Sequence, residues 1–83
     1  MFSAQQKAKI IWNCRRGMLE LDLILQRFSK KHLDELTDEQ FIAFEHLLTH
    51  QDPDLYAWFM GYEQPEQKEL VEIVAFIQRH DHA

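Results

Sequence analysis

A short stretch near the N-terminus, WNCRRGMLELD, concentrates side chains that could bind another molecule. Arg15 and Arg16 come directly before Gly17, and Glu20 and Asp22 follow it. A helix, a glycine and a second helix would place these charges at one sharp corner, beside unpaired backbone N–H groups of the second helix. Such a corner can bind a partner's carboxylate or phosphate through Arg16 while Glu20 accepts a hydrogen bond from the partner.

The same spacing also allows an intramolecular interpretation. Arg16 and Glu20 are four residues apart, which would pair them on one helix that tolerates Gly17. Removing either member of such an exposed pair would cost folding well under about 1 kcal/mol. Whether Trp12 is buried or exposed is also left open, because its neighbours compete for the inward face of the first helix. An exposed Trp12 beside the arginines would be an interface anchor.

A second acidic group lies near the middle of the chain, at Asp52 and Asp54. Asp52 before Pro53 is typical of a helix N-cap followed by proline at the first helical position. Asp54 would then be a first-turn carboxylate, which the helix dipole favours. These roles account for both side chains without a catalytic acid pair.

Three other residues with metal-binding or nucleophilic side chains have simpler interpretations. His46 and His50 have the four-residue spacing of two zinc ligands on a helix, but no third ligand is spaced to join them. Their position near a predicted helix C-terminus favours solvent-facing histidines. Cys14 is expected to be a small buried residue of the first helix rather than a reactive thiol. We therefore expect no metal site.

Capping signals and apolar periodicity predict five helices in an all-α, compact five-helix bundle, with residues 1–83 as a single domain. Two glycines and two prolines leave little turn chemistry for a sheet. The first helix would run from a Ser3–Gln6 capping box to about Arg16, and the second from Met18 to about Lys30. The third would run from a Thr37–Gln40 capping box to near His50. A short fourth helix would lie between Asp52 and Gly61, and the last would open at Pro65.

The charge distribution narrows the class of partner. The net charge is -5, with seven of the nine basic residues in residues 1–31 and twelve of the fourteen acidic residues in residues 32–83. Most of this surface would repel phosphate, so nucleic acid is not an expected partner. The asymmetry suits docking onto a protein of mixed charge, or else mutual attraction of the two halves within the fold. Without a leader-like or membrane-spanning apolar run, we expect a cytoplasmic monomer with no membrane insertion.

Arg16-Gly17-x-x-Glu20 matches the RGxxE motif of the SdhE family, the succinate dehydrogenase FAD assembly factors, some of which are also named antitoxin CptB. Supporting matches surround this motif and recur near residue 52: Arg15, Met18, Leu21, Asp22, Asp52-Pro53-Asp54-Leu55 and Trp58. The resemblance extends from about Lys9 to Ile77 and includes the family's length and helix rhythm.

The resemblance implies an assembly factor, or chaperone, for covalent flavinylation. Its partner would be the flavoprotein subunit of succinate dehydrogenase or fumarate reductase, whose own active site links FAD to a histidine. The partner-binding residues implied are Trp12, Arg15, Arg16, Gly17, Glu20, Asp22, Asp52 and Asp54. The chain shows no glycine-rich phosphate loop and no nucleophile–base pair, so we expect no catalytic residue and no cofactor of its own. The alternative is an antitoxin that acts by binding a protein.

Overall fold

The starts of two helices are fixed by the predicted capping boxes. The computed structural model describes residues 3–80. In front of α1 (Ala4–Asn13), the Gln6 N–H donates to Ser3 Oγ at 3.1 Å and the Ser3 N–H donates to Gln6 Oε1 at 2.8 Å. Thr37 and Gln40 make the same pair of bonds in front of α3 (Asp38–Leu47). Both capping boxes are confirmed, and each satisfies N–H groups that a helix start leaves unpaired.

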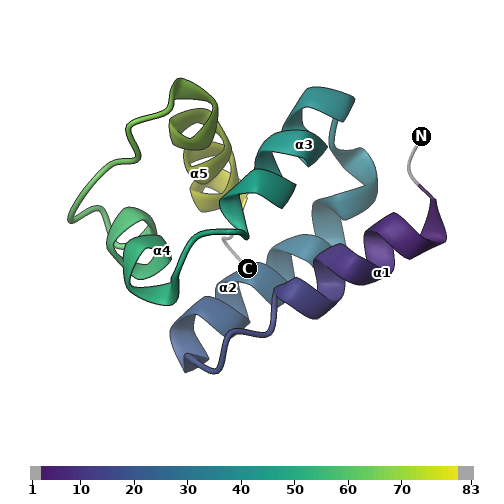
Figure 1. Ribbon diagram of the computed structural model, residues 1–83, viewed down its shortest axis with the longest axis horizontal. Coiled ribbons are helices and arrows are strands. Elements are labelled where there is room, and N and C mark those ends of the chain that lie inside the picture. Colours follow the sequence, from purple (N-terminus) through teal and green to yellow (C-terminus); the bar gives the residue numbers. More distant parts are fainter. Residues whose placement is uncertain (1–2, 81–83) are drawn as a thin grey trace.

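The remaining elements complete an all-α fold, as predicted. They are α2 (Leu19–His32), a 3₁₀ turn η1 (Leu33–Glu35), α4 (Asp52–Phe59) and α5 (Lys68–His80), and residues 3–80 contain no strand. Figure 1 shows α1 lying alongside α2, with the chain reversing at the corner between them. α3 packs on α5, and α4 packs on both α2 and α5. The radius of gyration is 11.7 Å, about the value for a folded domain of this length.

One apolar core joins all five helices. Its most deeply buried large side chains come from every helix: Ile10, Leu21, Leu25, Phe28, Phe41, Phe44, Leu47, Leu55, Leu70 and Ile77. Phe28 contacts Phe44 and Phe76 edge to face, with ring centroids 5.4 and 5.8 Å apart. These are the stripes that the helical periodicity predicts, because residues three and four apart share one face of a helix.

Four predicted boundaries are wrong, and one of them is the end of the third helix, which lies at Leu47 rather than near His50. α1 ends at Asn13 rather than near Arg16, because Cys14 is fully buried as the C-cap and the chain then turns away. Asp52 is the first residue of α4 rather than its N-cap, and the N-cap Gln51 makes no side-chain cap bond. Pro65 does not open the last helix: it is buried in the connection between α4 and α5, and α5 begins at Lys68.

Not every large apolar side chain of the helices is buried in the core. Leu19 is 72% exposed and Leu23 47% exposed, both on α2, and Trp58 is only partly buried against the core. On α1, Ile11 is 50% and Trp12 73% exposed, which resolves the open question about Trp12. The first two helices therefore carry much of the exposed apolar surface of the described residues.

Candidate functional site

The corner between α1 and α2 depends on the backbone of Gly17. Its φ is +82°, in the left-handed region that residues with a side chain rarely adopt. A Cβ built at Gly17 would have no other atom within 4 Å, so the requirement for glycine is conformational rather than steric. The absence of a side chain also leaves this point of the surface open to close approach.

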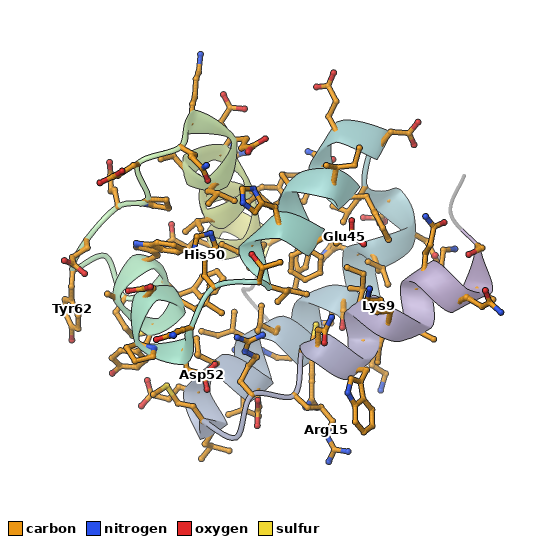
Figure 2. All side chains as sticks on the ribbon, viewed as in Figure 1. Lys9, Arg15, Glu45, His50, Asp52 and Tyr62 are labelled. Carbon is orange, nitrogen blue, oxygen red and sulfur yellow. The ribbon has the colours of Figure 1, made fainter. Side chains whose placement is uncertain are left out.

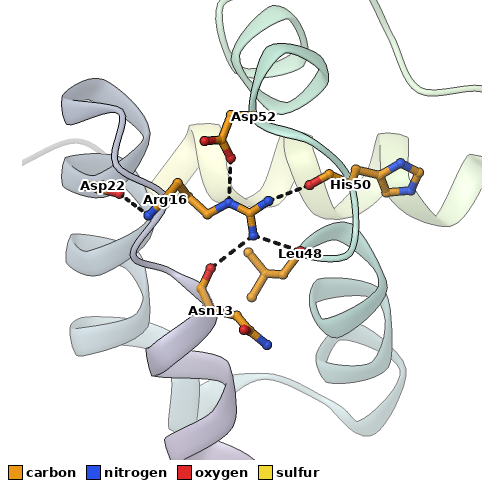
Figure 3. A network of polar contacts seen from close by, with 6 residues as sticks. All are labelled: Asn13, Arg16, Asp22, Leu48, His50 and Asp52. Atoms are coloured by element: carbon orange, nitrogen blue, oxygen red, sulfur yellow. Dashed lines mark hydrogen bonds and ion pairs between the residues drawn. The ribbon is translucent and has the colours of Figure 1, made fainter.

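Arg16 is the centre of a polar network that joins three helices (Figure 3). Its Nε donates to Asp52 Oδ1 at 2.7 Å, and its Nη1 donates to the carbonyls of Asn13 at 3.2 Å and Leu48 at 2.8 Å. Its Nη2 donates to the carbonyl of His50 at 2.5 Å. Four of the five N–H groups of the guanidinium are therefore satisfied within the chain.

The partners of Arg16 explain why an arginine suits this position. Asn13 ends α1 and Leu48 is the C-cap of α3, so their carbonyls lack helical N–H partners and carry the negative end of the helix dipole. Asp52 supplies a full charge from the first turn of α4. The Arg16 side chain is 15% exposed and that of Asp52 29%, so water screens this pair only partly. One fixed cation thus holds together the ends of three helices.

Asp22 holds the backbone of the same corner. The Arg16 N–H donates to Asp22 Oδ1 at 2.6 Å, which ties the loop before Gly17 to the first turn of α2. Arg16 lies in this loop and not on α2, so the four-residue spacing does not stack it over Glu20. The ion-pair partner of Arg16 is Asp52, 36 residues away in the sequence.

The predicted site residues separate into two groups. Arg16, Asp22 and Asp52 come together in the network, where Arg16 donates to Asp22 through its backbone N–H and to Asp52 through its side chain. The other five are exposed: Trp12, Arg15, Gly17, Glu20 and Asp54. In Figure 2, Arg15 points away from the body of the molecule, whereas Asp52 lies between the helices. Asp54 lines a separate depression with His50 and Trp58, beside the connection from α4 to α5.

Tyr56 belongs to this region but was missed from the sequence. The negative charge of Glu20, which also hydrogen-bonds to the phenol, raises the pKa of Tyr56 above its ordinary value. The Tyr56 ring contacts that of Tyr62 with centroids 6.2 Å apart. Glu20 thus lies beside an aromatic pair from the other half of the chain, in which Tyr62 is exposed and Tyr56 is partly buried against the core. Nothing in the local sequence spacing links residues 20 and 56.

The model of the Sdh5 family, described as flavinator of succinate dehydrogenase, matches residues 8–81 of this chain. The match includes the whole corner, the Arg16 network and the aromatic pair. This chain belongs to the Sdh5 family.

Individual relatives agree with the Sdh5 assignment. A protein named FAD assembly factor SdhE from Legionella pneumophila (strain Lens) is 58% identical over 77 residues, covering 93% of this chain and 96% of the relative. One of the same name from Idiomarina loihiensis is 47% identical over 73 residues, covering 88% and 81%. A solution structure of a UPF0350 protein is 44% identical, with a TM-score of 0.82, over 98% of this chain and 86% of that one. The fold and the family are therefore shared.

Two further properties of this Sdh5 chain concern metal and membrane. Among residues 3–80, no three histidine, cysteine, aspartate or glutamate side chains are grouped so that they could hold a metal ion. The ring of His46 instead contacts Glu69 at 3.2 Å, and that of His50 packs on Trp58 with centroids 5.1 Å apart. Within the same described range, no helix is both long and apolar enough to cross a membrane.

Cys14 is expected to be chemically inert in the folded Sdh5 chain. Burial raises the pKa of its thiol from 9.0 to about 11, against the lowering effects of a Ser29 hydrogen bond and the Arg16 charge. Because the thiolate is the nucleophile, iodoacetamide near neutral pH should alkylate the native protein far more slowly than the unfolded protein. The measurement is the mass of the alkylated product over time, with and without denaturant; equal rates would contradict the burial of Cys14.

Proposed function

We propose that this chain is an FAD assembly factor that binds the flavoprotein subunit of succinate dehydrogenase and promotes covalent attachment of FAD. The observation that carries the proposal is the Sdh5 family match over residues 8–81. Relatives that share most of their length with this chain are named FAD assembly factor SdhE. The RGxxE corner supports it, because its exposed part offers a cation, an anion and open backbone on one small surface.

The geometry suggests a division of work among the motif residues. Arg16 acts as a positioning residue: with Asp52 and Asp22 it fixes the angle between the helices. Arg15, Gly17 and Glu20 are exposed and contact the client, with Trp12 on the adjacent face. Preorganising a docking surface lowers the ordering cost of binding, so a rigid corner gains affinity even where Arg16 does not touch the client.

The proposal also covers the oligomeric state and location of the chain, its lack of chemistry of its own, and a second client. The chain acts as a monomer in the cytoplasm and without a catalytic residue, metal or cofactor of its own. It holds the client in a conformation in which the client's own active site forms the bond to FAD. The flavoprotein subunit of fumarate reductase is proposed as a second client of the same kind. The names of the relatives favour this function over the antitoxin alternative.

The direct test is co-expression with the flavoprotein subunit in a host that lacks its own assembly factor. Covalent FAD survives denaturation, so flavin fluorescence of the client band after a denaturing gel reports attachment. We expect strong fluorescence with the chain and little without it, at equal amounts of client protein. Equal covalent flavin in both cultures would overturn the proposal.

A further inference from the structure

A groove lies between α1 and α2, and one of its lining residues, Ile11, is the sequence neighbour of Trp12. The groove has a volume of about 350 Å³. Its lining residues are Ile11 of α1, Arg15 of the loop that follows α1, and Gln26, Ser29 and Lys30 of α2. Both charged residues that line it are basic. The Arg16 network does not contribute to this lining, so the groove is distinct from the corner's polar centre.

The polar groups at the base of the groove are already satisfied. Ser29 is 8% exposed, its Oγ donates to the carbonyl of Gln26 at 3.2 Å, and it also hydrogen-bonds to Cys14. No buried polar atom there requires a polar ligand. The middle of the groove therefore favours apolar groups, and only its rim favours charge.

Both helices that form the groove also carry exposed apolar side chains. Ile11 is 50% and Trp12 73% exposed on α1, and Leu19 and Leu23 are 72% and 47% exposed on α2. Leu19, Leu23, Gln26 and Lys30 follow the i, i+4, i+7, i+11 positions of one stripe along α2. An apolar strip between two antiparallel helices with a basic rim has the shape that accepts a third helix.

We propose that this groove, which we call the α1–α2 groove, binds an acidic amphipathic helix of a partner protein. Leucine-like side chains of that helix would cover Ile11 and pack on Trp12. Its carboxylates would pair with Arg15 and Lys30. The basic rim made by Arg15 and Lys30 favours an acidic partner, and a groove between two helices fits a rod-like helix better than a flat anionic lipid surface.

The inference deepens the proposed function and rests on it only for the identity of the partner. In a flavoprotein client, an acidic helix would extend the contact from the RGxxE corner along the groove, with Arg15 and Trp12 where the two contacts meet. Two joined contacts bind more tightly than either alone when the geometry allows both. The experiment below uses no client, so its failure and failure of the proposed function are distinguishable.

The test uses two synthetic helical peptides with identical leucine positions, one carrying glutamates on its polar face and the other lysines. Calorimetry on the unsubstituted chain gives the affinities. Because the chain has two tryptophans, the Trp58→Phe variant reports the environment of Trp12 alone by fluorescence. We expect the acidic peptide to bind, to shift the Trp12 emission to the blue and to weaken with added salt. The lysine peptide should not bind.

A matched pair of double variants locates the site. Arg15→Ala with Lys30→Ala should weaken the acidic peptide about tenfold or more, and Trp12→Ala should do the same. Lys68→Ala with Arg79→Ala makes the same change in net charge on α5 and should have no effect. Equal binding of the two peptides, or equal loss in both double variants, would overturn the proposal. So would binding to anionic vesicles without binding to the acidic peptide.

Discussion

Replacing Arg16 with alanine is expected to destabilise the fold strongly. The change removes an ion pair with Asp52 and leaves three carbonyls without their donor, two at helix ends and one in the connection between α3 and α4. Leaving a partly buried charge unpaired costs roughly 2–4 kcal/mol, after allowance for the exposure of Asp52. In a domain this small, the thermal midpoint should fall by more than about 10 °C.

Arg15→Ala is the matched control, because it removes the neighbouring arginine from an exposed position. Thermal unfolding by circular dichroism should show a change of less than about 0.5 kcal/mol for this variant. The stability of Arg16→Lys should fall between those of the two alanine variants. Lysine keeps the charge but lacks the planar guanidinium that donates to a carboxylate and three carbonyls at once. If Arg16→Ala unfolds at the same temperature as Arg15→Ala, the network is not structural.

This expectation reverses the one that follows from the sequence alone. The four-residue spacing suggests an exposed Arg16–Glu20 pair worth well under about 1 kcal/mol. In the structure Arg16 lies in the loop that connects α1 to α2, and its ion-pair partner Asp52 is 36 residues away in the sequence. Local patterns carry no information on such a contact, because it depends on how α1, α3 and α4 pack. The three carbonyl partners cannot be predicted from the sequence either, because every residue has a carbonyl.

The parts of the fold that were predicted correctly have local causes. The two capping boxes and the glycines that end α4 and form the corner act through neighbouring residues, so their sequence signals suffice. Boundaries set by tertiary packing were not predicted. α5 begins late because Pro65 is taken into the core instead of into the helix. Leu19 and Leu23 are apolar residues on a helix with a separate buried stripe, and periodicity could not show that they face outward.

Replacing Glu20 with alanine should have the opposite profile to Arg16→Ala: nearly full stability and a large loss of client binding. Glu20 is exposed and, among residues 3–80, hydrogen-bonds to the phenol of Tyr56, so folding should lose well under about 1 kcal/mol. A carboxylate that becomes desolvated against a donor of the client is worth roughly 2–5 kcal/mol to binding. That is a loss of about thirtyfold or more in affinity.

The measurement is covalent FAD on the flavoprotein client at increasing concentrations of wild-type chain, Glu20→Ala and Glu45→Ala. Glu45 is an exposed glutamate on α3, so its variant controls for the loss of a surface charge. Glu45→Ala should match the wild-type chain. Glu20→Ala should need a much higher concentration for the same flavin signal and then recover it, because a binding defect is overcome by mass action. If Glu20→Ala melts early and its activity falls only in proportion to its folded fraction, then Glu20 supports the fold, and the corner is not a docking surface at this residue.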